Sequence, residues 1–261
     1  MLIAVVLTSI WVFPPWTTTA LAAVVAVAAG GEVARLAGRI GAEVPAVFVG
    51  LAAGTVAVSF VIPWPATTLS DTGSLTAVLL VIPIASGVLT LALGPPDAHA
   101  FTRAGVMSMA PLYVGMPLGA LTWIHWTFGP GVTTWLLATV VVSDSAQYYT
   151  GRAFGRRKLA PAISPGKTVE GAVGGLVAVM VAGFIIGPRA LPGLTPVVGS
   201  LVAVGLAAFG LAGDLFESAL KRSAGVKDSS GIIPGHGGVL DRIDAYLFAA
   251  PMFYLALRYV L

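Results

Sequence analysis

The chain has 261 residues, of which 57% are hydrophobic and only 10% are charged, and its mean hydropathy is +0.94. Soluble domains carry about 25% charged residues, so this composition excludes a water-exposed globular protein and predicts one that lies largely within a lipid bilayer. The chain contains no cysteine, which excludes disulfides and thiolate metal ligands, and its formal net charge is +3.

Apolar runs divide the chain into about nine predicted membrane spans, since each crossing helix needs roughly 20 apolar residues and Pro and Gly pairs mark the breaks. In chain order the predicted spans are 2–13, 17–37, 45–62, 73–94, 105–128, 131–150, 170–187, 196–216 and 240–260. We therefore expect an all-α polytopic transmembrane protein, one membrane domain with an N-terminal part, 1–130, and a C-terminal part, 131–261. The abundant Gly and Ala residues are interpreted as helix-packing positions.

The basic residues test this span count. Twelve of the 14 Lys and Arg residues fall in or beside the connections after the second, fourth, sixth and eighth spans, and only Arg189 and Arg258 fall toward the other side. Basic residues are retained in cytoplasmic loops, so we expect these four connections and the N-terminus to be cytoplasmic.

Two polar segments interrupt the apolar sequence, and both lie on the predicted cytoplasmic side. The first runs from Ser143 to Gly171 and contains Asp144 and Lys167. Asp144 in an apolar span has two open interpretations, a helix-packing hydrogen bonder or a functional carboxylate. The basic residues 152, 156 and 157 are taken as topology or lipid-headgroup determinants.

The second polar segment runs from Gly213 to Asp244 and has the pattern of a metal and phosphate site. Four of its residues have the i, i+3, i+4, i+7 spacing of one helix face: Asp214, Glu217, Ser218 and Lys221. Asp241 and Asp244 repeat the i, i+3 spacing, and carboxylates at a membrane depth where charge is costly are functional candidates. Oxygen ligands favour Mg²⁺, which is usually held by one or two carboxylates together with water and substrate phosphates.

Basic and glycine residues of this segment suit a polyphosphate. Lys221, Arg222 and Lys227 can balance phosphate charge, and glycines near His236 allow close backbone approach to phosphate oxygens. The alternatives are that His236 caps a turn and that Asp241 and Arg242 form an ordinary interfacial ion pair. They do not account for four acids, residues 214, 217, 241 and 244, converging at one depth.

The segment Ser218 to Asp244 resembles the signature of the phosphatidate cytidylyltransferases. It is similar at fixed spacing and without a gap to the pattern S-x-x-K-R-x(4)-K-D-x(5)-P-G-H-G-G-x-x-D-R-x-D. Residues 144–151 and 163–171 are similar to a second block of that family, apart from Gln147, where Ala is expected. The resemblance covers roughly residues 140–261, and the first 130 residues are compatible with it only in hydropathy.

The resemblance implies that CTP and phosphatidate give CDP-diacylglycerol and pyrophosphate in phospholipid biosynthesis, with Mg²⁺ required and a second, monovalent ion left open. It implies a catalytic C-terminal half with Asp214 and Asp241 as metal ligands. Further catalytic candidates are Lys221, Arg222, Lys227, Asp228, His236 and Asp244. Substrate-binding candidates are Asp144, Lys167, Glu217, Ser218 and Arg242. We expect a homodimer in a bacterial inner membrane, with a cytoplasmic active site and no nucleic-acid partner.

Three other classes compete with this interpretation. A CTP-dependent lipid kinase would transfer the γ-phosphate, but the complete signature string argues against it. A secondary transporter would place its charges near the bilayer centre, whereas these gather at one face. A non-catalytic lipid-binding scaffold explains basic loops but not aligned carboxylates.

Overall fold

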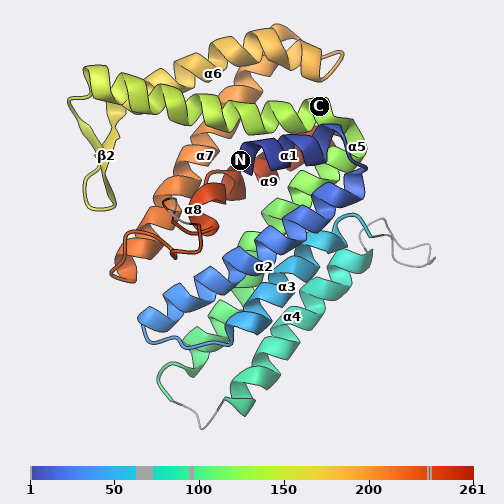
Figure 1. The fold of residues 1–261 in the computed structure, drawn as a ribbon, viewed down its shortest axis with the longest axis vertical. Helices are drawn as coiled ribbons and strands as arrows, with labels where there is room; N and C mark the ends of the chain where they lie inside the picture. Colours follow the sequence, from blue (N-terminus) through green and yellow to red (C-terminus); the bar gives the residue numbers. More distant parts are fainter. Residues whose placement is uncertain (1, 63–72, 94–96, 234, 236) are drawn as a thin grey trace. The chain divides into compact units, whose positions relative to one another are not determined.

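The computed structural model describes residues 2–62, 73–93, 97–233, 235 and 237–261. Their elements are, in chain order, α1 (Leu2–Trp11), α2 (Pro15–Arg39), α3 (Ala46–Ser59), α4 (Gly73–Ala92), α5 (Ala100–Phe154), β1 (Lys158–Ala160), β2 (Ser164–Thr168), α6 (Val169–Ala190), α7 (Pro196–Ser223), α8 (Leu240–Ile243) and α9 (Tyr246–Tyr259) (Figure 1). The prediction of a helical protein is confirmed.

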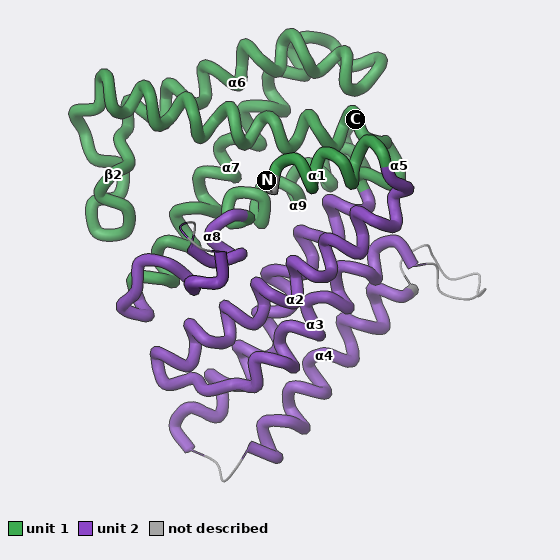
Figure 2. Tube along the Cα trace, in the orientation of Figure 1, with its two compact units in different colours: residues 1–12, 124–222, 243–261 green, residues 13–123, 223–242 purple. Residues whose placement is uncertain are grey.

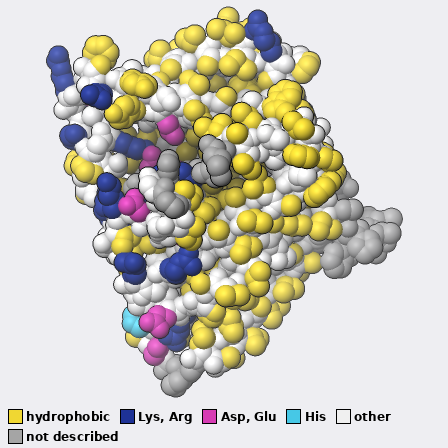
Figure 3. Space-filling view, in the orientation of Figure 1, with side chains coloured by type: hydrophobic (Ala, Val, Ile, Leu, Met, Phe, Trp, Pro, Cys, Tyr) yellow, Lys and Arg dark blue, Asp and Glu magenta, His cyan; other side chains and the backbone are white. Residues whose placement is uncertain are grey.

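Within the described residues, five helices are long and apolar enough to cross a membrane: α2, α4, α5, α6 and α7. Hydrophobic side chains occupy much of the visible surface (Figure 3), as a surface that faces lipid requires. α5 has 55 residues, and at about 1.5 Å per residue it is far longer than one crossing of about 30 Å. The sequence placed two spans here, with a break at Gly129 and Pro130. The structure has non-helical backbone at Gly129, with φ 78° and ψ −171°, which confirms the break.

The chain forms two compact units (Figure 2). Unit 1 contains residues 1–12, 124–222 and 243–261. Unit 2 contains residues 13–123 and 223–242. The second polar segment is therefore divided, because its helical part to residue 222 belongs to unit 1 and the loop that follows belongs to unit 2.

In unit 1, glycines bring α6 and α7 together. A Cβ atom on Gly183 would lie 2.5 Å from the carbonyl oxygen of Gly199, and one on Gly199 would lie 2.6 Å from that of Gly183. Neither position has room for a side chain. The interpretation of the small residues as packing positions is confirmed here, and close backbone approach of this kind provides dispersion contacts in lipid.

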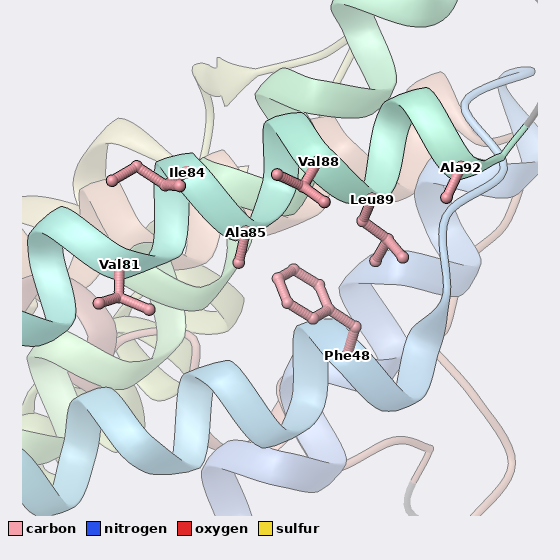
Figure 4. A pocket seen from close by; sticks show the side chains of 7 residues that line it. All are labelled: Phe48, Val81, Ile84, Ala85, Val88, Leu89 and Ala92. Atoms are coloured by element: carbon pink, nitrogen blue, oxygen red, sulfur yellow. The ribbon is translucent and has the colours of Figure 1, made fainter.

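Unit 2 packs α2 against α3 in the same way, since a Cβ atom on Gly50 would lie 2.6 Å from the carbonyl oxygen of Val27. The same unit has a pocket of about 410 Å³ between Phe48 of α3 and six side chains of α4 (Figure 4). All seven lining residues are apolar. The pocket therefore offers no side-chain group that could orient a nucleotide or a phosphate.

Three local features differ from the sequence expectation. β1 and β2 form an antiparallel hairpin that pairs Lys158 with Thr168, in the connection between the predicted spans 131–150 and 170–187, where no strand was predicted. α7 continues to Ser223, beyond the predicted end at 216, because the polar residues that follow still favour a helix. The predicted span 240–260 is two helices, α8 and α9, with Asp244 and Ala245 between them.

Candidate active site

The polar end of α7 carries a row of paired side chains in unit 1. Lys221 Nζ lies 2.5 Å from Glu217 Oε2, an i, i+4 ion pair, and the Ser218 hydroxyl donates to Asp214 Oδ1 at 3.3 Å. Glu217 is fully buried. The helical spacing predicted from the sequence is thus confirmed. It places Ser218 beside Asp214 and Lys221 beside Glu217 on one face of α7.

The hairpin brings Lys167 to this helix. Lys167 Nζ lies 2.5 Å from Asp214 Oδ2, although the two residues are far apart in the sequence. Arg222 Nε donates to the carbonyl oxygen of Ile163 at 3.2 Å, which links the end of α7 to the turn of the hairpin. The two polar segments of the sequence therefore meet in unit 1.

Glu170 on α6 holds the base of the same hairpin. Its carboxylate accepts hydrogen bonds from the backbone N–H groups of Arg156 and Arg157, at 3.0 and 3.1 Å, and from Arg157 Nε at 3.2 Å. The Thr168 hydroxyl caps α6 by accepting from the Gly171 N–H at 3.1 Å. Sequence analysis assigned neither role, although Thr168 has the residue type and position of an N-cap.

Asp144 of α5 and Asp244, which precedes α9, complete the cluster. Both carboxylates lie within electrostatic range of Asp214, and Asp144 lies near Lys167 and Asp244 near Lys221. We call these five residues the acid–lysine cluster. It contains three carboxylates and two ammonium groups.

In unit 2 the structure shows what surrounds Asp241. Its Oδ2 accepts hydrogen bonds from the Gly238 N–H at 2.7 Å and from the N–H and hydroxyl of Ser229, both at 3.0 Å. Gly237 has φ +78°, and a Cβ atom there would lie 2.7 Å from the same oxygen. Asp241 thus organises the loop that precedes it.

A second carboxylate binds this loop, and sequence analysis missed it. Glu32 of α2 is fully buried and accepts hydrogen bonds from Ser229, Ser230, Val239 and Leu240. The signal was present, because Glu32 is an acid inside the predicted span 17–37, and an ionisable residue within a span is a functional candidate by default.

The remaining candidates are not brought into these contacts. Lys227, Asp228 and Arg242 are exposed in unit 2, and His236 lies outside the described residues. Of the two expected metal ligands, Asp214 belongs to unit 1 and Asp241 to unit 2. Among the described residues, no group of three or more acidic or histidine side chains is arranged to hold a metal ion.

Comparison with known proteins finds bacterial relatives, two of which are named phosphatidate cytidylyltransferases. The chain is 40% identical over 172 residues to the phosphatidate cytidylyltransferase of Bacillus subtilis, covering 65% of this chain and 64% of that protein. It is 35% identical over 193 residues to the phosphatidate cytidylyltransferase of Thermotoga maritima, covering 69% and 68%. It is also 46% identical over 131 residues to the uncharacterized protein YnbB of Escherichia coli, covering 50% and 44%.

The chain spans between 44% and 68% of the length of these three relatives. The model of the cytidylyltransferase family matches nearly the whole chain, residues 1–260. That match includes both polar segments and the helices that carry the acid–lysine cluster, and it extends the resemblance to the first 130 residues. The chain therefore belongs to the cytidylyltransferase family.

Proposed function

We propose that the protein is a phosphatidate cytidylyltransferase, which converts CTP and phosphatidate into CDP-diacylglycerol and pyrophosphate. The observation that carries the proposal is the acid–lysine cluster of unit 1, a concentration of charge in an otherwise apolar chain of this family. Two bacterial relatives that carry the name of this activity support it.

The chemistry of this reaction determines what the site must supply. Phosphatidate presents a phosphomonoester whose second pKa is about 6, so its attacking oxygen is ionised at neutral pH and needs no general base. That oxygen forms a bond to the α-phosphorus of CTP, and the bond from this phosphorus to the β-phosphate oxygen breaks. Pyrophosphate leaves with the electron pair. The obstacle is the repulsion between two anions, which positioned positive charge reduces.

We propose Mg²⁺ as the cofactor, with Asp214 and Asp241 as its protein ligands and a monovalent ion as an open addition. The donor set fits, because Mg²⁺ usually takes one or two carboxylates and completes its shell with water and substrate phosphates. Asp214 already binds one positively charged group, the ammonium of Lys167. When bound, the ion would neutralise phosphate charge during the transfer.

The basic residues would bind the triphosphate. Lys167 and Lys221 are held by their partners, Asp214 and Glu217, so each ammonium group is fixed in place before the nucleotide arrives. Arg222, whose Nε donates to the carbonyl oxygen of Ile163, would contribute the positive charge of its guanidinium group. Lys227 is exposed and would contribute from the loop in unit 2.

Other candidates receive supporting roles. We assign Glu217 to positioning Lys221, since it is fully buried and paired with that residue. Asp144, Ser218 and Asp244 would adjust the charge and hydrogen bonding of Asp214. Asp228, His236 and Arg242 remain proposed substrate contacts from the signature.

The finer topology is part of the proposal. Nine spans, with the N-terminus and both polar segments on the cytoplasmic side, are supported by the distribution of the basic residues. CTP would enter from water and phosphatidate sideways from the bilayer, so the site would open to both at headgroup depth. A bacterial inner membrane and a homodimer are proposed from the family resemblance.

The test is product analysis with purified protein, phosphatidate in detergent micelles, Mg²⁺ and CTP labelled on either the α- or the γ-phosphate. The proposal requires the α-label in a lipid product and the γ-label in pyrophosphate. Transfer of the γ-label to lipid would show a lipid kinase instead. Absence of any labelled product under these conditions would contradict both activities.

A further inference from the structure

The described residues of the loop between α7 and α8, which are 224–233, 235 and 237–239, include several that donate hydrogen bonds to a carboxylate near the N-terminal end of the chain. Glu32 Oε1 accepts from the Ser230 hydroxyl at 2.6 Å and the Val239 N–H at 3.0 Å. Its Oε2 accepts from the Leu240 N–H at 2.7 Å and the Ser229 hydroxyl at 2.9 Å. All five residues belong to unit 2, which unites residues 13–123 with 223–242 (Figure 2). We call this loop the signature loop.

Removing any of the hydrogen bonds to the Glu32 carboxylate would cost free energy. Glu32 is fully buried, and removing a carboxylate from water is unfavourable unless hydrogen bonds replace its hydration. The four donors are all neutral, so the charge is stabilised by directed hydrogen bonds, which are stronger to an ionised acceptor than to a neutral one. Because every donor comes from the loop or from the first residue of α8, the carboxylate can be satisfied only when the loop has this conformation.

Ser229 connects Glu32 to Asp241. Its hydroxyl lies 2.9 Å from Glu32 Oε2 and 3.0 Å from Asp241 Oδ2. A hydroxyl has one proton, so it donates to one carboxylate at a time. Asp241 also accepts from the backbone N–H groups of Ser229 and Gly238. Since Glu32 fixes the loop on both sides of these donors, it fixes the orientation of Asp241.

We propose that Glu32 is a positioning residue of the transfer reaction: its buried carboxylate holds the signature loop and thereby sets the orientation of Asp241. This inference rests on the proposed function and deepens it. The first third of the chain would then contribute to the site through one side chain, Glu32 of α2.

Replacing Glu32 by Gln keeps the size of the side chain but removes its charge and one of its two acceptor oxygens. A Gln amide has one oxygen and one NH₂ group, so one of the two carboxylate oxygens becomes a donor. The hydroxyls of Ser229 and Ser230 can rotate to accept from it. The backbone N–H of either Val239 or Leu240 then faces another donor, and a buried unsatisfied donor is destabilising. The loop must therefore shift in Glu32→Gln, whichever way the amide is oriented.

The experiment compares wild type with Glu32→Gln, Glu32→Asp and Ser230→Ala. The matched control is Glu43→Gln, the same change at an exposed position of the same unit. Hydrogen–deuterium exchange of the peptide covering 229–240 reports the loop without depending on activity. Steady-state kinetics with CTP and phosphatidate, normalised to folded protein, report the reaction.

We expect faster exchange in 229–240 for Glu32→Gln and a kcat about 10- to 100-fold lower, the usual effect of losing an outer-shell contact. The KM for CTP should rise by a smaller factor than kcat falls, because Lys167 and Lys221 of unit 1 are untouched and only Lys227 lies in the loop. Glu32→Asp retains both acceptor oxygens and should recover part of kcat. Ser230→Ala removes one donor and should show a smaller effect of the same kind, which keeps the test available if Glu32→Gln does not fold.

Unchanged exchange in Glu32→Gln would overturn the proposal whatever the activity. A normal kcat per folded molecule, with only the yield or thermal stability reduced, would show a structural role and would also overturn it. If wild type itself makes no CDP-diacylglycerol, the proposed function fails, while the exchange measurement still decides whether Glu32 holds the loop.

Discussion

Gly213 of α7 allows a sharp test of how the acid–lysine cluster is held together. A Cβ atom at this position would lie 2.6 Å from the carbonyl oxygen of Asp244 and 3.1 Å from Cδ2 of Phe248. The first contact is with backbone, which cannot rotate away. Since Cβ contacts under 3.0 Å are essentially never seen and ordinary contacts begin at 3.4 Å, Gly213→Ala must separate the two segments by about 0.4 to 0.8 Å.

That displacement acts directly on the proposed site, because Asp214 follows Gly213 and Asp244 carries the contacted carbonyl. A shift of about 1 Å at a reacting centre costs about 100-fold in rate, so we expect kcat/KM to fall about 10- to 100-fold. Overpacking destabilises by about 1–3 kcal/mol, while replacing a helical Gly by Ala contributes about 1 kcal/mol in the other direction. The net loss of stability should therefore be small, about 0–2 kcal/mol.

Gly205→Ala on the same helix is the matched control, since nothing lies within 4 Å of its added Cβ atom. It should leave kcat/KM unchanged and slightly raise thermal stability. The assay is CDP-diacylglycerol formation in mixed micelles, with thermal unfolding in the same detergent. Wild-type kcat/KM in Gly213→Ala, or an equal loss in Gly205→Ala, would refute the reasoning that backbone contact at residue 244 sets the site.

The other predictions concern charge roles and topology. Asp214→Asn and Asp241→Asn should each abolish turnover while the protein still elutes as a folded species in size-exclusion chromatography; near-wild-type rates at saturating Mg²⁺ would contradict the metal assignment. Lys167→Ala should mainly raise the KM for CTP, since the lysine is proposed to capture phosphate, and an unchanged KM would count against that role. In this cysteine-free chain, Ala153→Cys and Gly231→Cys should both resist an impermeant thiol reagent in intact cells and react after lysis. Both positions are exposed, so labelling of either from outside would refute the cytoplasmic placement.

The sequence by itself determined the elements and the chemical character of the site. Apolar run lengths predicted the long apolar helices α2, α4, α6 and α7, the Gly129–Pro130 pair predicted the break in α5, and the helical spacing predicted that Glu217 and Lys221 share a helix face. These properties are local, because they depend on hydrophobicity over about 20 residues and on the helical repeat. The signature string likewise predicted the family that the whole-chain match confirms.

Sequence analysis could not predict the partners of the charged residues. Lys167 pairs with Asp214 across 47 positions of the chain, and the signature loop is held by Glu32, 197 positions before Ser229. Such pairings depend on which helices become neighbours, a result of side-chain packing over the whole unit and of close contacts such as that of Gly50 with Val27. A periodic pattern predicts which face of a helix is polar, whereas the residue that meets this face is decided only when the chain folds.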